Sequence, residues 1–170
     1  KNPDSPYFGR FLYLPGEIIQ DKGIFTKYAG FSPMCLIYKS NPGVTHGELT
    51  AQRALEVSCN YFFYELGDRL SIDYLNKTAN ALGLGVPTGI ELTEKVGWVT
   101  DEASKKAAYG ETGVDSQVTT GDRILAAIGQ AENRFSPLQL CVYASTLANK
   151  GTRMKATFLS RVVASDYSSL

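Results

Sequence analysis

The chain has 170 residues, 44% hydrophobic and 20% charged, which are the proportions of an ordinary globular domain with one core. Its seventeen basic residues balance its seventeen acidic ones, so the charge excludes an electrostatic preference for nucleic acid or an anionic membrane. No apolar run approaches the roughly 18 residues of a membrane span, and three cysteines are too few for a disulfide scaffold.

The first 47 residues are rich in loop-forming residues. We expect irregular structure over residues 1–20, where prolines and a glycine lie among aromatic residues. Residues 21–47 mix glycines and prolines with β-favouring residues at 24–26 and 36–38. This pattern predicts a long loop that contains two short strands, forming a small hairpin. A loop of this length with little regular structure is usually functional or disordered.

Three consecutive helices are predicted between residues 50 and 82. The first begins at Thr50, an acceptable N-cap, and ends at Ser58; the second covers residues 60–70 and the third residues 72–82. The aromatic residues at 61–64 are expected in the core. The tripeptide Ser58-Cys59-Asn60 lies where the first two helices meet, because Ser and Asn favour helix ends and breaks.

The next segment, residues 83–120, is rich in Gly, Thr, Asp and Lys. It is predicted to be a long exposed connection with short elements at most. Trp98 and Tyr109 are the candidates for anchoring it to the body of the protein.

Two helices and a strand are predicted in the last third of the chain. A helix-period pattern ends at Gly129, and Ser136-Pro137 is a helix start with its N-cap serine and first-turn proline. We expect Cys141, in that last helix, to be a small buried hydrophobe. Residues 158–164 are predicted to form a strand.

Ser58 and Asn60 suit an acyl-transfer site. A hydroxyl can relay a proton, and a carboxamide can donate and accept hydrogen bonds at once. A three-residue pattern alone carries little weight, however, and also fits a plain helix break.

Three stretches, in this order, resemble class B penicillin-binding proteins, and together they span about residues 20–163. The resemblance rests on His46-Gly47-Glu48-Leu49 with Ala54 to Gly67, on Leu82-Gly83-Leu84-Gly85 with Thr88 to Leu92, and on Ala127-Ile128-Gly129-Gln130 with Ser136 to Leu140 and Leu147 to Gly151. It implies a mainly α fold: the helical lobe of the β-lactamase/transpeptidase-like fold, with a short hairpin and a C-terminal strand from its sheet.

The family needs a nucleophilic serine with a lysine three residues later, and a Lys-Ser/Thr-Gly strand. Neither motif occurs in this sequence; Lys39-Ser40-Asn41 and Lys77-Thr78-Ala79 both fail at the glycine. We therefore expect residues 1–170 to be a partial transpeptidase domain, with the first motif upstream and the other downstream. This chain alone is expected to be inactive.

By resemblance, the parent protein is a serine-type D,D-transpeptidase that cross-links peptidoglycan stem peptides and binds β-lactams. Ser58 would relay a proton between the nucleophile and its lysine, and Asn60 would orient that lysine and hold the amide of the substrate. Gln130 would support the site. The parent would act on the extracytoplasmic face of a bacterial membrane, through an anchor absent from this chain, with cell-wall synthesis partners.

Three alternatives remain open on the sequence. A β-lactam sensor would be acylated without turning over. A class D β-lactamase shares the motif set but is smaller and lacks the connection at 83–120. A non-catalytic scaffold would have no nucleophile at all.

A metal site is a further hypothesis, because the only histidine, His46, lies between Cys35 and Cys59. Thiolate and imidazole are ligands that zinc prefers, and Asp21 offers a fourth. Some elongation-type penicillin-binding proteins resemble this, pinning the loop beside their active site with Asp, His and Cys. A zinc ion here would order residues 21–47 against the helix break. A Cys35–Cys59 disulfide and an unligated histidine stay as alternatives.

Overall fold

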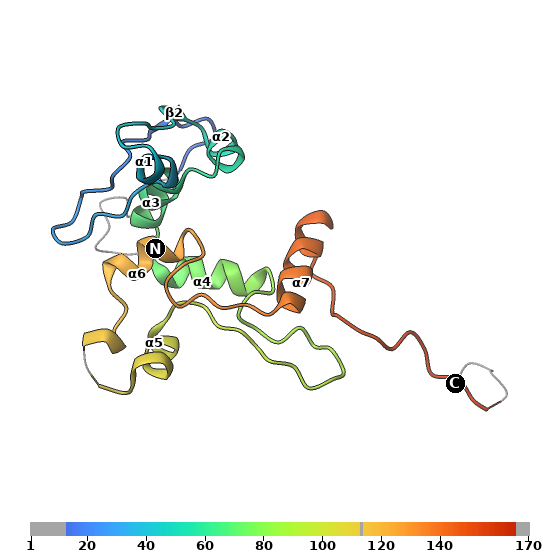
Figure 1. Cartoon of the computed structure of the whole chain (residues 1–170). Helices are drawn as coiled ribbons and strands as arrows, with labels where there is room; N and C mark the ends of the chain where they lie inside the picture. The colour runs from blue at the N-terminus through green and yellow to red at the C-terminus, as the bar shows by residue number, and fades with distance from the viewer. Residues whose placement is uncertain (1–12, 113, 166–170) are drawn as a thin grey trace. The chain divides into compact units, whose positions relative to one another are not determined.

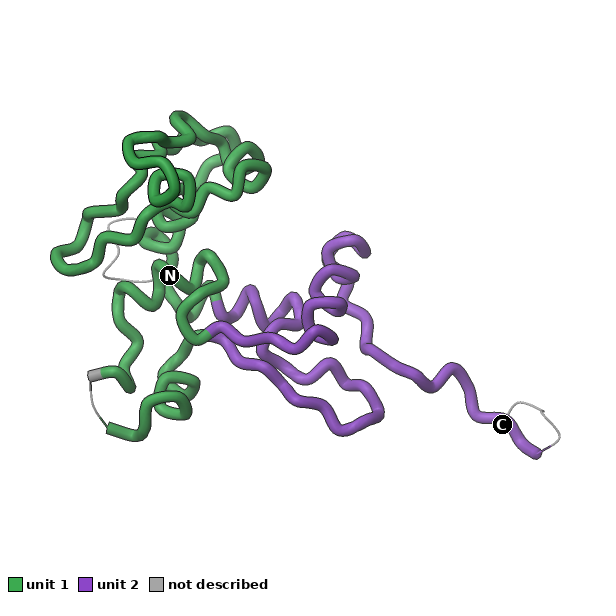
Figure 2. The backbone as a smooth tube through the Cα atoms, in the orientation of Figure 1, with its two compact units in different colours: residues 1–75, 100–132 green, residues 76–99, 133–170 purple. Residues whose placement is uncertain are grey.

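The computed structural model describes residues 13–112 and 114–165 and divides the chain into two units. Figure 2 shows them in different colours: the first holds residues 1–75 and 100–132, and the second residues 76–99 and 133–170. The expectation for residues 1–12 lies outside the described residues.

The first unit is mainly helical, as predicted (Figure 1). Its helices are α1 (Leu36–Ser40), α2 (Ala51–Glu56), α3 (Asn60–Arg69), α5 (Glu102–Tyr109) and α6 (Thr120–Ala126), with a 3₁₀ turn at Val114–Ser116. Strands β1 (Ile19–Gln20) and β2 (Glu48–Leu49) pair antiparallel, with Ile19 opposite Leu49. Helix α4 (Ile72–Ala81) begins in this unit and ends in the second.

Helix α3 forms the centre of the core in the first unit. Its buried aromatic residues Tyr61 and Tyr64 both make edge contacts with Phe25 of the long loop, and burying a ring the size of Phe25 contributes about 2–3 kcal/mol. On α3, Gly67 lets α6 approach closely, since a Cβ there would lie 2.7 Å from the Cβ of Ala127. The prediction that the aromatic residues at 61–64 belong to the core is confirmed, with Phe63 only partly buried.

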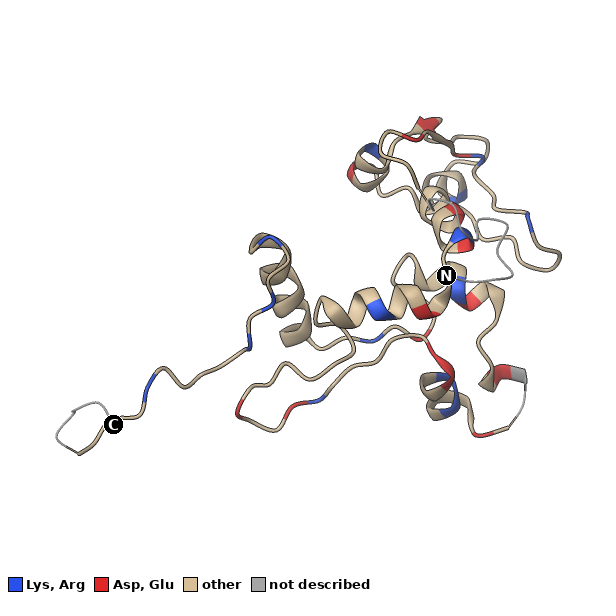
Figure 3. Ribbon diagram, turned by 180° about the vertical axis from the view of Figure 1, so that it is seen from behind, with Lys and Arg blue, Asp and Glu red and all other residues tan. Residues whose placement is uncertain are grey.

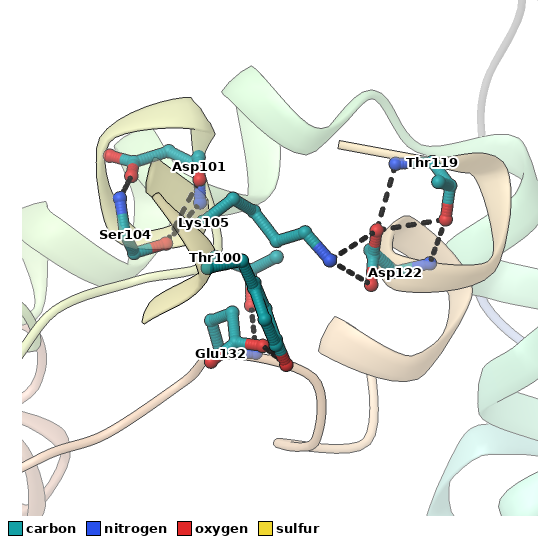
Figure 4. Close-up of polar contacts among 8 residues, drawn as sticks. Thr100, Asp101, Ser104, Lys105, Thr119, Asp122 and Glu132 are labelled. Carbon is teal, nitrogen blue, oxygen red and sulfur yellow. Dashed lines mark hydrogen bonds and ion pairs between the residues drawn. The ribbon is translucent and has the colours of Figure 1, made fainter. Parts of the chain in front are cut away.

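A buried polar cluster joins α5 to α6 (Figure 4). The Lys105 ammonium lies 3.3 Å from the Asp122 carboxylate, with 8% and 15% of the two side chains exposed. Asp122 also forms a capping box with Thr119 at the start of α6. Nearby, the Tyr109 hydroxyl donates to the carboxylate of buried Glu132 at 2.7 Å. The bond to Glu132 attaches the predicted anchor Tyr109 to the segment that follows α6, although about half of the Tyr109 side chain stays exposed.

The second unit contains α7 (Pro137–Ala148), which starts at the predicted N-cap Ser136 with a capping box. The fully buried side chain of Gln139 attaches α7 to the loop that follows α4: its amide group donates to the Val86 carbonyl at 2.7 Å and its oxygen accepts from Gly97 N–H at 3.1 Å. Trp98, the other predicted anchor, pairs with Arg134 through two backbone hydrogen bonds.

Four local predictions were wrong. Residues 24–26 form no strand beyond an isolated bridge between Ile24 and Met34. Residues 36–38 belong to helix α1, whose Tyr38 ring lies so close to Gly23 that a Cβ on Gly23 would be 2.0 Å from it. Residues 158–164 form no strand beyond an isolated bridge at Val163, since Phe158 N–H donates to the Glu91 carboxylate rather than to a neighbouring strand. Cys141 is exposed because α7 buries Gln139, Val142 and Thr146 instead.

Charged residues of both signs are interspersed along both units (Figure 3), in line with their equal numbers. Among the described residues, no helix is both long and apolar enough to cross a membrane.

Candidate functional site

Ser58 occupies the turn that ends α2. Cys59 N–H donates to the Ala54 carbonyl at 2.9 Å and Ser58 N–H to the Leu55 carbonyl at 3.2 Å, which is the hydrogen-bond pattern of a Schellman motif. Ser58 takes its left-handed position with φ 53°, where glycine is usual. The side chain of Ser58 is exposed, so the turn holds its hydroxyl at the surface.

Cys59 and Asn60 begin α3 directly after that turn. Cys59 is the N-cap residue and is fully buried, while Asn60, the first helical residue, is partly buried. The three residues of the tripeptide thus differ in exposure: Ser58 is exposed, Cys59 is buried and Asn60 is partly buried. The sequence correctly predicted a helix junction here with Ser58 and Asn60 flanking Cys59.

The four predicted metal-ligating residues come together in the first unit. One donor atom from each of Asp21, Cys35, His46 and Cys59 lies within 4.8 Å of every other. His46 Nδ1 is 2.9 Å from Asp21 Oδ2 and 3.5 Å from Cys35 Sγ, and the two sulfur atoms are 3.9 Å apart.

The small sheet and the loop bring these residues together. Asp21 follows β1 and His46 precedes β2, and Asp21 N–H donates to the Gly47 carbonyl at 2.8 Å, which continues the pairing of the strands. The Gly23 carbonyl accepts from Cys35 N–H at 2.8 Å and so positions the N-cap of α1. The loop therefore brings three of the four ligand-type side chains to Cys59, the N-cap residue of α3.

The electrostatics of the cluster differ between its members. Burial opposes the charge on Asp21, but hydrogen bonds from the backbone N–H groups of His46 and Gly23 outweigh it, so the pKa of the Asp21 carboxyl is lowered. Burial raises the pKa of the Cys59 thiol, and nearby Asp21 raises it further. Without a cation, the cluster therefore combines a carboxylate with a protonated Cys59 thiol.

Two of the distances between donor atoms match those around a tetrahedral metal ion. Zinc bonds of about 2.0–2.3 Å to oxygen, nitrogen and sulfur place neighbouring ligand atoms about 3.3–3.8 Å apart. The sulfur–sulfur and sulfur–nitrogen distances of 3.9 and 3.5 Å agree with this. The shorter distance between His46 and Asp21 is that of a hydrogen bond. Asp21 Oδ1 accepts from Gly23 N–H at 2.8 Å, which leaves Oδ2 to face the other donors.

A second buried carboxylate, which the sequence analysis missed, holds the loop to α3 and α6. Asp68 pairs with Lys27 and accepts from the Tyr28 hydroxyl at 2.6 Å and from Arg123 at 3.2 Å. The bond to Asp68 raises the pKa of Tyr28. The available signal was helical spacing, since Asp68 shares the buried face of α3 with Tyr61 and Tyr64.

Gln130, expected to support the site, is exposed. Its N–H donates to the Leu125 carbonyl at 3.1 Å, just after Gly129 at φ 76°. The described contacts therefore place Gln130 in the turn that ends α6 and in no contact with Ser58 or Asn60.

Comparisons with known proteins agree on one family. Residues 26–169 match the family model described as the penicillin binding protein transpeptidase domain. The peptidoglycan D,D-transpeptidases MrdA of Acinetobacter baumannii and of Salmonella typhimurium strain SL1344 are 29% and 31% identical over 110 and 107 residues, which cover 64% and 62% of this chain and 16% of each relative.

Solved structures show the same fold. Penicillin-binding protein PBP2 from Helicobacter pylori superposes with a TM-score of 0.71 at 25% identity, over 85% of this chain and 26% of that one. PBPA from Mycobacterium tuberculosis gives a TM-score of 0.70 at 20% identity, over 92% and 33%.

The chain spans about a sixth of the length of the curated relatives that it matches. Within that span, the family model covers most of the chain, including the helix junction, the α6 turn and α7. The chain belongs to the transpeptidase family of the penicillin-binding proteins, class B.

Proposed function

We propose that this chain supplies the Ser58 hydroxyl and the Asn60 carboxamide to the active site of a peptidoglycan D,D-transpeptidase. The observation that carries the proposal is the Ser58-Cys59-Asn60 junction, where a left-handed turn exposes the hydroxyl and the first turn of α3 holds the carboxamide beside it. The named relatives, peptidoglycan D,D-transpeptidases, support the reaction class.

In this proposal, a longer protein carries this chain and provides the remaining groups. The sequence has no serine with a lysine three residues later and no Lys-Ser/Thr-Gly, so the nucleophile and its lysine come from elsewhere in that protein. Ser58 would pass a proton between them and the leaving amine, and Asn60 would orient the lysine and bind the amide carbonyl of the substrate. The acyl-enzyme forms on the serine outside residues 1–170.

The substrate in this proposal is a peptidoglycan stem peptide, and β-lactams acylate the same serine. The longer protein would be membrane-anchored, face the outside of a bacterial cell and work with other cell-wall synthesis proteins. A structural relative, PBP2 from Helicobacter pylori, has been solved in complex with MreC, which supports that class of partner.

Labelling with a fluorescent penicillin tests the proposal. We expect a covalent band for the longer protein and none for residues 1–170, because positioning groups cannot replace a nucleophile. Stoichiometric labelling of residues 1–170 would contradict the assignment. Labelling of the longer protein without cross-linking of stem peptides would favour a β-lactam sensor, and no labelling of either would favour a scaffold.

We further propose that Asp21, Cys35, His46 and Cys59 hold a zinc ion. The donor distances support it, as does the burial of both cysteines. The ion would supply the loop at 21–47 with a cross-link to the start of α3. Because Cys59 lies between Ser58 and Asn60, that cross-link would also fix the junction that carries both groups.

Elemental analysis tests the zinc site in residues 1–170 purified without chelator. We expect about one zinc per chain, retained in Cys141→Ser and lost in Cys59→Ser, because Cys141 is the exposed cysteine. Chelation should lower the melting temperature of the wild type and of Cys141→Ser but not that of Cys59→Ser. Less than a tenth of an equivalent of zinc, with no thermal shift when zinc is added, would remove the proposal.

A further inference from the structure

Two of the four clustered donors are thiols that can react with each other. Cys35 Sγ and Cys59 Sγ lie 3.9 Å apart, and both residues are fully buried. A disulfide needs a sulfur–sulfur distance of about 2.05 Å, so one sulfur must move by roughly 1.9 Å. The third cysteine, Cys141, is exposed, so Cys35 and Cys59 are the buried pair.

We propose that Cys35 and Cys59 are a reversible oxidation site, at which a peroxide converts the two thiols to a disulfide that excludes the metal ion. The exclusion of metal rests on the zinc site proposed above. A sulfur atom that has formed a disulfide has no thiolate charge left to offer a metal. Asp21 and His46 would remain, and two ligands do not make the four-ligand set of a structural zinc site.

The chemistry balances with hydrogen peroxide as the oxidant. One thiolate attacks a peroxide oxygen, which gives a sulfenic acid and hydroxide; the second thiolate then attacks that sulfur and displaces another hydroxide. The two sulfur atoms lose two electrons in total and the peroxide gains two. Two protons convert both hydroxides to water, and the zinc ion leaves as the thiolates are consumed.

The two sides of the pair differ in their freedom to move. Cys59 is fixed by the Schellman bonds that end α2 and by its place at the start of α3. Cys35 precedes α1, a five-residue helix that contains no buried residue. Cys35 is itself buried and its N–H donates to the Gly23 carbonyl, but the residues of α1 that pack on the core, Ile37 and Tyr38, are only partly buried. We therefore expect the loop side to close the distance.

The Asp21 side of the loop has contacts that do not involve sulfur. Asp21 Oδ2 accepts from His46 N–H at 3.0 Å and contacts His46 Nδ1 at 2.9 Å, and Asp21 N–H donates to Gly47. These contacts survive when the thiols pair. The oxidised chain should therefore stay folded. Its Cys59 would be bonded to Cys35 instead of to the ion, and this replacement would take place between Ser58 and Asn60.

The test uses zinc-loaded residues 1–170 treated with a few equivalents of hydrogen peroxide. A chromogenic chelator follows released zinc, thiol titration under denaturing conditions counts free cysteines, and mass spectrometry of peptides locates the bond. We expect free thiols to fall from three to one per chain, with one zinc released for each Cys35–Cys59 disulfide. Reduction with dithiothreitol and added zinc should restore both values.

Matched variants separate this pair from the exposed thiol. Cys141→Ser should fall from two thiols to none and release zinc as the wild type does, whereas Cys35→Ser should form no intramolecular disulfide. A chain that keeps its zinc and its thiols, or that loses zinc through sulfinic acid or a bond to Cys141, overturns the inference and leaves the zinc site standing. A chain that binds no zinc but forms the Cys35–Cys59 bond overturns the zinc site and upholds the oxidation site.

Discussion

Ser58 shows how a single residue can carry strain at a functional position. Its φ of 53° lies in the left-handed region, which costs a residue with a Cβ about 1 kcal/mol or more relative to glycine. The position is the one that glycine usually takes in a Schellman motif. The chain nevertheless keeps a serine there, which is expected if its hydroxyl has a chemical role that glycine lacks.

Substitutions at Ser58 should separate stability from function. We expect Ser58→Gly to raise the free energy of unfolding of residues 1–170 by roughly 0.5–1 kcal/mol, because it relieves the left-handed strain. Ser58→Ala keeps the Cβ and should be close to wild type. Urea denaturation of the three proteins measures the difference. If Ser58→Gly were no more stable than Ser58→Ala, the turn would not be strained as described.

At the scale of elements, the polar cluster between α5 and α6 stabilises residues 100–132, the second of the two sequence segments that make up the first unit. Lys105 reaches Asp122, whose carboxylate also accepts from Thr119 N–H at 2.8 Å. The same ammonium lies 4.8 Å from the centre of the Tyr109 ring. Since Asp122 completes the capping box of α6, and α6 packs on α3 at Gly67, this cluster supports the helix that carries Asn60.

Removing the Lys105 charge tests that support. We expect Lys105→Met, which keeps most of the apolar stem, to lower the free energy of unfolding by about 2 kcal/mol, because Asp122 loses its buried cation. Lys106→Met is the matched control, since Lys106 is the exposed neighbour on the same helix, and it should change stability by less than about 0.5 kcal/mol. Equal effects of the two substitutions, measured by urea denaturation, would contradict this role.

Local patterns predicted the helices well and the polar burial poorly. Helices α2, α3, α4 and α7 begin within about a residue of the predicted starts, because caps and helix-ending glycines are read from neighbouring residues. The buried role of Gln139 was not predictable in this way. Its partners Val86 and Gly97 are 53 and 42 residues away, and no local pattern indicates that they meet.

Contacts between residues distant in sequence also explain why some elements were predicted wrongly and why part of the candidate site was missed. Residues 36–38 have side chains that favour strands, yet they form part of helix α1. In that helix Tyr38 contacts Gly23, a residue that lies outside the local pattern. The four donors were named from residue type, and the structure brings them within 4.8 Å. Asp68 was missed because its partners Lys27, Tyr28 and Arg123 come from separate segments.

At the scale of the whole molecule, we propose that the junction of α2 and α3 supplies one part of a transpeptidase site. The first unit also contains the loop that carries three of the proposed zinc ligands, a sheet of two short strands and the α5–α6 cluster. The second unit has its own organisation around Gln139 and the Trp98–Arg134 pairing. In the proposed function, Asn60 takes part in acylation, and every other assignment at this junction depends on that role.

The most direct measurement is the rate of acylation by a fluorescent penicillin of the longer protein carrying Asn60→Ala, beside its melting temperature. We predict a rate lower by roughly 10²-fold or more, the effect of losing one positioned polar group at a reacting centre, with a melting temperature close to wild type. Asn60→Asp should also be slow, because it keeps an acceptor but loses the amide donors. Gln52→Ala, which removes an exposed carboxamide from α2, should react like wild type. An unchanged rate in Asn60→Ala, or a loss of stability large enough to account for the slower rate, would contradict the assignment.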